Sequence, residues 1–406
     1  MKALRALLCI LLVGPVLFAA SCSAQMRDVP APTVVERVDR SALLKAGDQR
    51  VLVLQGSHYQ MGYAYGKLLA AEVRENIEDV LRLAAQADAQ RQVPAPGALE
   101  MIYQRTKAFV PQEYTEELHG LADGAGLDRH KIELANVFPE MFHCSVFVLK
   151  DKATRDGKMI HGRALDYSVG VAPGLQDHAI VIVNKPDGEN ATMLGSYVGF
   201  IGCITGVSDK KLSAGMMGMG EYGKWDGQPM AYLFRQALEK CDTVEQAVKL
   251  ITEATRTCQY SYLIADGKDR QAAAIHATTE YANTVGFGEA YRLWPESIED
   301  TILVSADERY GHLVSRVRKH YGQIDVEKAI EILTRPVAMA GNLQDAVMLP
   351  EERVMYLANA VSPDQRNFQA CYQPYYRHEM ATYLAALEKL AGEHRIETPT
   401  SAPAQP

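Results

Sequence analysis

Two β-prone runs on either side of a short turn constrain this chain more than any other stretch. The first run begins at Cys144, the turn is Arg155-Asp156-Gly157, and the second run ends with Arg163 and Asp166. Two such runs joined by a turn predict a β-hairpin. Pairing of the two strands would return the end of the second to the start of the first, so Arg163 and Asp166 are expected beside Cys144.

A thiol next to a guanidinium and a carboxylate is a candidate nucleophile. The thiolate is the reactive form of cysteine, and a neighbouring positive charge lowers the pKa of the thiol. The hairpin therefore predicts that Cys144 is a nucleophile, with Arg163 and Asp166 as its partners.

Helical and strand patterns alternate along most of the chain. Apolar residues recur at three- and four-residue spacing from about residue 58 to 87. Short β-prone runs separated by turns fill residues 144–220, and further helices and strands alternate up to about residue 334. Because no linker inside 51–390 is long enough to separate two domains, we expect one layered α+β domain with a helical first third packed on its sheets.

The composition excludes some partners. The 406 residues are 48% hydrophobic and 23% charged, as in a globular protein with a full core. A formal net charge of −8 leaves no basic stripe, so nucleic acid is not an expected partner. The chain has no Cys-x-x-Cys or His-rich spacing and no phosphate-loop motif, so no metal ligands and no cofactor are expected.

The N-terminus has the pattern of an export signal. Lys2 and Arg5 precede an apolar run over residues 7–18 that is too short to span a bilayer. Ala19-Ala20-Ser21-Cys22 resembles a bacterial lipoprotein box, which predicts a signal peptide over 1–22 and lipidation of Cys22. Ordinary cleavage near Ser23 is the alternative. We expect an exported protein, either a cell-envelope lipoprotein that meets the membrane only through its lipid anchor or a secreted protein.

Two polar segments are expected outside the folded domain. Residues 23–50 are polar with scattered prolines and are predicted to be a tether. Residues 391–406 end in a stretch rich in proline and are predicted to be a disordered tail.

Several short motifs occur in a fixed order along residues 50–385. They are Gly56-Ser57-His58-Tyr59-Gln60-Met61-Gly62-Tyr63-Ala64-Tyr65-Gly66, Cys144-Ser145, Asp156-Gly157, Gly162-Arg163, Leu165-Asp166, Gly223-Lys224-Trp225-Asp226-Gly227-Gln228-Pro229-Met230 and Tyr260-Ser261-Tyr262-Leu263-Ile264-Ala265-Asp266. In this order they resemble the N-terminal-nucleophile (Ntn) amide hydrolases. The branch they resemble is the acyltransferase-like one, which contains penicillin acyl-coenzyme A:isopenicillin acyltransferase, acid ceramidase and bile-salt (choloylglycine) hydrolase.

This resemblance implies a fold and a division of the chain. The fold is a four-layer αββα sandwich with a helical N-terminal segment packed on it. Cleavage of the precursor between His143 and Cys144 would produce a helical pro-segment or small chain, 51–143, and a catalytic region, 144–390. Together the two would form one domain.

The resemblance also implies a reaction. The free α-amine of Cys144, with an unperturbed pKa of roughly 7.7–8.0, would act as general base. Arg163 would favour the thiolate and bind a substrate oxygen, and Asp166 would orient the α-ammonium and Arg163. The substrate would be a small linear acyl amide. An acyl-thioester on Cys144 would then be resolved by water or by an amine acceptor.

The chain departs from the family pattern at the expected oxyanion donors. Ser208 stands where the family carries an asparagine in a glycine-rich turn, and Ser305 falls where a Thr-Asn pair is usual. Arg309 follows closely, as an arginine does in ceramidase-like members. Ser208, Ser305 and Arg309 are therefore the candidate oxyanion or substrate-binding residues.

Two other functions are compatible with the sequence. One is a conventional Cys–His hydrolase that uses His143 or His161 as its base and does not cleave itself. The other is a non-catalytic lipoprotein that keeps the fold for binding. Cleavage at Cys144 distinguishes the leading hypothesis from both.

Overall fold

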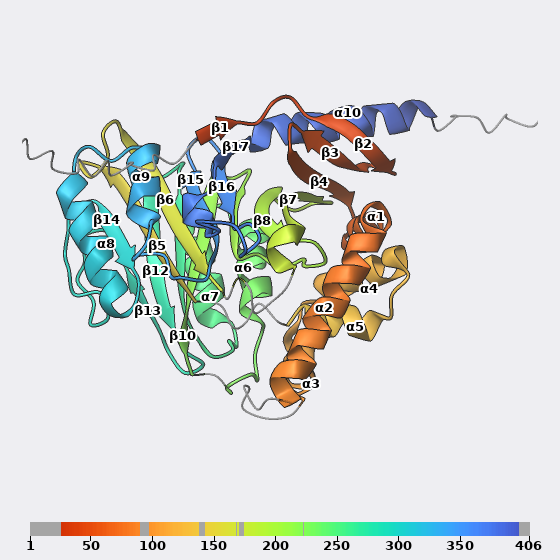
Figure 1. Cartoon of the computed structure of the whole chain (residues 1–406), viewed down its shortest axis with the longest axis horizontal. Coiled ribbons are helices and arrows are strands. Elements are labelled where there is room, and N and C mark those ends of the chain that lie inside the picture. Colours follow the sequence, from red (N-terminus) through yellow and green to blue (C-terminus); the bar gives the residue numbers. More distant parts are fainter. Residues whose placement is uncertain are drawn as a thin grey trace, which may run out of the picture.

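The computed structural model describes residues 26–89, 97–137, 143–167, 169, 174–221 and 223–397. The predicted signal peptide, including Cys22, lies outside the described residues. Two sheets and ten helices make up the described part of the chain (Figure 1).

The first sheet has seven strands. Their order across the sheet is β1 (Met26–Asp28), β17 (Tyr375–Glu379), β16 (Val354–Asn359), β15 (Asn342–Leu349), β6 (Gly157–Asp166), β5 (His143–Asp151) and β14 (Thr301–Val304). The predicted hairpin, β5–β6, lies between β15 and the edge strand β14. β5 and β6 pair antiparallel, with Cys144 opposite Leu165 and Val146 opposite Arg163.

The second sheet has ten strands. Their order is β13 (Ala282–Val285), β12 (Gln271–Ala277), β11 (Gln259–Asp266), β10 (Leu212–Gly220), β9 (Thr205–Ser208), β8 (Thr192–Tyr197), β7 (Ala179–Pro186), β4 (Gln49–Gly56), β3 (Ser41–Ala46) and β2 (Thr33–Val38). β10 lies against β5 and β6, so the two sheets face each other at the hairpin.

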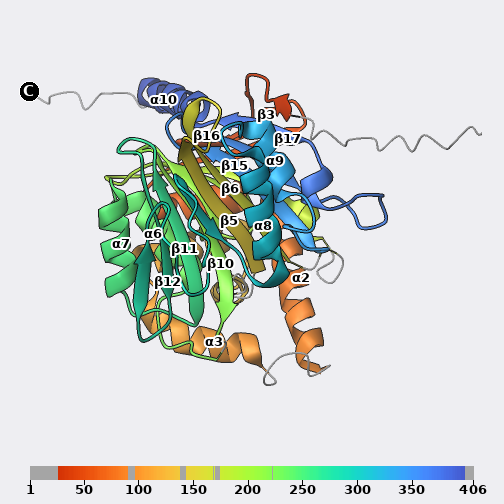
Figure 2. The ribbon, with the colours of Figure 1, turned by 90° about the vertical axis from the view of Figure 1, so that its left-hand side faces the viewer.

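Helices cover both outer faces of this pair of sheets. They are α1 (His58–Leu68), α2 (Ala70–Ala89), α3 (Ala98–Thr106), α4 (Gln112–Ala125), α5 (Arg129–Ala135), α6 (Met230–Lys240), α7 (Val244–Glu253), α8 (Asp307–His320), α9 (Val326–Leu333) and α10 (Met380–Glu397). Figure 2 shows α6 and α7 outside the second sheet, and α8 and α9 outside the first. The predicted α+β fold with αββα layers is confirmed. No described helix is long and apolar enough to cross a membrane.

The prediction of a tether over 23–50 is wrong for the described residues. β1 to β4 begin in this segment, and β4 continues the second sheet by pairing parallel with β7. Ala42 and Leu44 of β3 are buried, whereas Lys45 between Leu44 and Ala46 is exposed. This alternation of buried and exposed residues is too short to stand out in the sequence. The strand β7, which joins this segment to the rest of the sheet, lies far along the chain.

The predicted tail also begins too early. α10 runs to Glu397, so part of 391–406 is helical, and residues 398–406 lie outside the described residues. Tyr383, Leu387 and Leu390 are buried in a core shared with β4 and β7, which holds the helix in place. α10 lies along β2 and β3 at the top of Figure 1.

Glycines set the contact between α1 and α4. A Cβ atom on Gly62 would overlap the backbone carbonyl of Glu117, and one on Gly124 would overlap that of Tyr63. A Cβ on Gly66 would lie 2.5 Å from the backbone nitrogen of Ala125. The two backbones approach so closely that only glycine fits, which gives a physical reason for the glycine spacing in the first motif.

Gly66→Ala is expected to lower the free energy of unfolding by about 2 kcal/mol, because the added methyl group forces α1 away from α4. Gly311→Ala in α8 is the matched control, since a Cβ there meets open space. That control should raise stability by roughly 0.5–1 kcal/mol through helix propensity. Urea unfolding of both variants measures the difference, and equal stabilities would contradict the packing described.

Candidate active site

Cys144 lies in the space between the two sheets. The pleat of β5 sends Cys144, Val146 and Val148 into the core between the sheets, and Phe147 and Leu149 into the core beneath α8 and α9. Cys144 is fully buried. The strand forms here because both of its faces are covered by apolar layers.

Arg163 faces the thiol from the neighbouring strand. Its Nη2 donates to Cys144 Sγ at 3.0 Å, and its Nη1 donates to Thr205 Oγ1 of β9 at 2.6 Å. Its Nε lies 3.5 Å from the carbonyl oxygen of Met216 in β10. The guanidinium is 1% exposed, and the described residues place no carboxylate within 4.0 Å of it. The sulfur is therefore the group beside this buried charge that can become an anion.

The thiol is held neutral in the uncleaved chain. Burial raises the pKa of Cys144, and the Coulombic effect of Asp166 raises it further. Arg163 acts in the opposite direction, but the net pKa still lies above the usual value. A base or a change in solvation is needed before the sulfur can attack an amide.

Asp166 was predicted to orient Arg163, but the described contacts of its carboxylate are with other residues. Its Oδ2 lies 3.0 Å from Arg309 Nη1 of α8, and its Oδ1 accepts from the backbone N–H of Met339 at 2.9 Å. Asn342 Nδ2 also donates to Oδ1, at 3.3 Å. Residues three apart in a strand point to opposite faces, so Arg163 turns toward the thiol and Asp166 toward α8.

Burial of Asp166 raises its pKa to about 6, against the opposing effects of the Met339 N–H, Arg309 and Asn342. Arg309 also donates to the backbone carbonyl of Cys144 at 3.3 Å. The structure thus brings Arg309, the candidate oxyanion or substrate-binding residue, to both Asp166 and the backbone of Cys144.

The two predicted serines lie in different places. Ser305 Oγ is 2.7 Å from Ser145 Oγ, on the α8 side of β5 and one residue from Cys144. Ser208 ends β9, and its hydroxyl accepts the backbone N–H of Leu212 at 3.3 Å. Thr205 lies three residues before Ser208, and its hydroxyl accepts a hydrogen bond from Arg163.

His161, one of the two histidines of the Cys–His alternative, is not placed as a base for Cys144. His161 pairs with Val148, four residues along β5 from Cys144, or roughly 13 Å at about 3.3 Å per residue. Its Nδ1 is 2.8 Å from Ser213 Oγ, and burial, with a smaller effect of Arg163, lowers its pKa to about 3. The backbone of His143 is paired with Asp166 at the start of β5.

Other strands bring to the site residues that were not predicted from the sequence. Thr205 and Met216 approach from the second sheet, and Asn342 and the Met339 amide approach Asp166 from the chain around β15. No local pattern marks them, since each acts through sheet packing or strand pairing rather than through spacing along the chain.

The αββα layers, with Cys144 at the start of an inner strand, are the arrangement that the resemblance to Ntn hydrolases implies. The model of the "Acyl-coenzyme A:6-aminopenicillanic acid acyl-transferase" family matches residues 153–337. This match covers slightly less than half of the chain, and it confirms the resemblance seen in the motifs. The prediction of an enzyme of the amidohydrolase and acyltransferase class is confirmed at the level of the family.

The chain is also similar to individual proteins. It is 22% identical over 395 residues to protein dcd1A of Dictyostelium discoideum, covering 86% of this chain and 89% of that protein. It is 25% identical over 203 residues to acid ceramidase of Mus musculus, covering 43% of this chain and 50% of the ceramidase. The chain therefore spans half the length of that enzyme.

Among solved structures, the chain is similar to the Caenorhabditis elegans N-acylethanolamine-hydrolyzing acid amidase ortholog. The identity is 18%, the TM-score is 0.41, and the match covers 51% of this chain and 93% of that one.

Asp166→Asn is expected to change the pH dependence of stability. Because the folded-state pKa of about 6 lies above the ordinary 3.8, ionisation of Asp166 costs the folded state more than the unfolded state. The stability that Asp166 contributes should therefore fall by roughly 2–3 kcal/mol as the pH rises from 4 to 7, at about 1.4 kcal/mol per pKa unit.

Denaturant unfolding at several pH values measures this effect. Both proteins should carry Cys144→Ala, so that they share one covalent form. A stability difference between them that stays constant or grows in favour of Asp166 as the pH rises would contradict the burial of this carboxyl group.

Proposed function

We propose that the protein is an exported, self-processing cysteine amide hydrolase or acyltransferase that forms an acyl-thioester on Cys144. The observation that carries this proposal is the 3.0 Å contact between Arg163 Nη2 and Cys144 Sγ, made by a buried guanidinium without a carboxylate partner among the described residues. Such a charge favours a thiolate and an oxyanion formed beside it.

Self-processing would begin at the peptide bond that enters β5. Cys144 Sγ attacks the carbonyl carbon of His143, the C–N bond breaks, and the Cys144 nitrogen leaves as an α-amine while a thioester forms. Water then hydrolyses the thioester, which restores the thiol and leaves His143 with a carboxylate. Because Asp166 is paired with His143, Asp166 would lie beside the new α-amine.

The new α-amine then supplies the base that the uncleaved site lacks. It takes the thiol proton, and the thiolate attacks the carbonyl carbon of an amide substrate while Arg163 stabilises the negative charge. The leaving amine takes the proton, and the acyl group remains on sulfur. Attack by water or by a second amine releases the acyl group and restores the thiol.

We propose small linear N-acyl amides as the substrate class. Acid ceramidase and the N-acylethanolamine-hydrolyzing acid amidase of Rattus norvegicus are among the proteins similar in sequence, which supports an N-acylated amine. An apolar acyl group would suit the surroundings of the sulfur, since Met216 Sδ lies 3.8 Å from Cys144 Sγ and Met217 is buried in the same core.

Cys144→Ala should leave a single chain, because the sulfur that attacks the His143 carbonyl is gone. Wild-type protein should give two fragments on denaturing electrophoresis, and N-terminal sequencing of the larger fragment should begin at Cys144. Cys144→Ser is the conservative variant and should cleave slowly. Cleavage of Cys144→Ala at the wild-type rate, or an uncut wild-type chain, would exclude this mechanism.

Export and lipidation of Cys22 are a separate part of the proposal, supported by the pattern of residues 1–22. Wild-type protein should incorporate a fatty-acid probe, and Cys22→Ser should be exported without the label. Unlabelled wild-type protein found outside the cytoplasm would indicate secretion without an anchor.

A further inference from the structure

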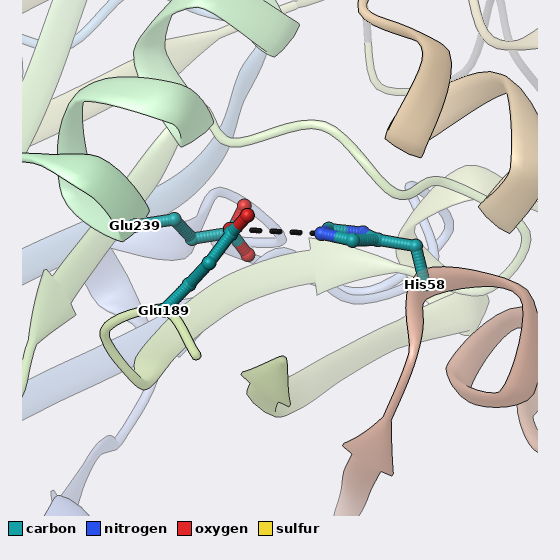
Figure 3. Close-up of side chains that lie close together, drawn as sticks. All are labelled: His58, Glu189 and Glu239. Atoms are coloured by element: carbon teal, nitrogen blue, oxygen red, sulfur yellow. Dashed lines mark ion pairs between the residues drawn. The ribbon is translucent and has the colours of Figure 1, made fainter. Parts of the chain in front are cut away.

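A histidine and two glutamates meet away from the β5–β6 hairpin (Figure 3). His58 is the first residue of α1, Glu189 lies in the turn between β7 and β8, and Glu239 lies near the end of α6. One side-chain nitrogen or oxygen from each residue lies within 4.8 Å of the other two. Three elements that are distant in the sequence thus direct possible metal ligands at one point.

One ring nitrogen of His58 is hydrogen-bonded, whereas the other has no hydrogen-bond partner in the described structure. Its Nδ1 is 2.6 Å from Oε2 of Glu117, a buried carboxylate on α4. Its Nε2 is buried and has no hydrogen-bond partner in the described structure, and it points at Glu189 Oε2, 3.6 Å away (Figure 3). Glu189 Oε2 is likewise buried without a hydrogen bond. His58 itself is only 7% exposed.

The carboxylates around His58 are held by fixed partners. Arg235 is fully buried, and its Nε lies 2.8 Å from Glu239 Oε1. Its Nη1 and Nη2 reach the two oxygens of Glu117 at 2.7 and 2.8 Å. Tyr114 Oη donates to Glu239 Oε2 at 2.8 Å. Glu117 and Glu239 are therefore positioned before any ligand arrives.

The cluster holds more carboxyl groups than basic side chains among the described residues. Glu117, Glu189 and Glu239 surround one buried guanidinium, and Lys240 Nζ reaches only the rim, 3.5 Å from Glu189 Oε1. The buried Nε2 of His58, which has no hydrogen bond in the described structure, faces these carboxylates.

We propose that His58 Nε2, Glu189 and Glu239 bind a divalent first-row transition-metal ion, with zinc as the representative. Imidazole and carboxylate are ligands that zinc accepts, at about 2.0–2.2 Å each. Ligand atoms 3.6 Å apart can both reach such an ion after a small adjustment. The contact from His58 Nδ1 to Glu117 is the one that metal-binding histidines commonly make through their second nitrogen.

No metal ligands were expected from the sequence because these three residues follow no local spacing. An imidazole ligand also argues against calcium or magnesium, which prefer oxygen alone.

The site would link the two parts of the chain. His58 and Glu117 precede the proposed cleavage point at residue 143, whereas Glu189, Arg235 and Glu239 follow it. If the chain is cleaved as proposed, the metal would help to hold the small chain on the catalytic chain. This consequence rests on the proposed function, but metal binding itself does not.

Titration of the untagged, chelator-treated protein with Zn²⁺ and Co²⁺ tests the site. Wild type should bind one equivalent, and its melting temperature should rise with Zn²⁺. Glu189→Gln should weaken binding by at least about tenfold, because it removes a ligand whose oxygen makes no other hydrogen bond. Glu113→Gln is the matched control, since Glu113 contacts the same Lys240 but is not among the ligands. It should bind within about threefold of wild type.

Cys144→Ala separates this test from that of the proposed function. It should bind Zn²⁺ as wild type does, whether or not the chain is cleaved. Failure of wild type to bind one equivalent would show that the cluster is an ion-pair network alone. Equal losses in Glu189→Gln and Glu113→Gln would indicate unspecific attraction by charge. An intense near-ultraviolet band with Co²⁺ would indicate cysteine ligands and would overturn the assignment.

Discussion

The buried guanidinium of Arg163 is the constraint on which the proposed active site depends. A charge removed from water requires hydrogen-bonding partners, and here they come from both sheets. Cys144 lies beside it on the same sheet, whereas Thr205 and Met216 lie on the other. The contact to the thiol is therefore complete only when the two sheets are packed together. The site is a product of the layered fold rather than of the hairpin alone.

The β-pleat divides the chemical groups between two faces of the hairpin. Cys144 and Arg163 face the second sheet, while Ser145 and Asp166 face α8, from which Arg309 reaches both Asp166 and the carbonyl of Cys144. The backbone at the start of β5 lies between these two sets of groups. This arrangement places a neutral sulfur on one side of the proposed scissile bond and a charged pair on the other, and the free α-amine would appear between them.

Part of this arrangement could be predicted from the sequence. Two β-prone runs on either side of a short turn predicted the hairpin. Hairpin pairing alone brought Arg163 next to Cys144, because register follows from local turn geometry. Arg163 and Asp166 were also expected to act as a pair. Positions three apart in a strand point to opposite faces, so the two side chains lie on different sides of β6.

What remained hidden depends on contacts between distant parts of the chain. Thr205 was missed because its role comes from packing of one sheet on the other, and Ser208 was preferred to it by position in a motif. The strands before residue 50 were missed because β4 pairs with β7, more than 120 residues later. The glycines of α1 were noticed as a motif, but their reason lies in α4.

The central claim is that Cys144 Sγ carries the acyl group during turnover, and mass spectrometry of acid-quenched reactions tests it directly. A panel of N-acyl amides with a chromogenic leaving group would supply the substrate. The account predicts an acyl adduct on the peptide that begins with Cys144, released by hydroxylamine as a thioester is, and formed more slowly by Arg163→Lys. Product formation without an adduct, or an adduct on another residue, would contradict it.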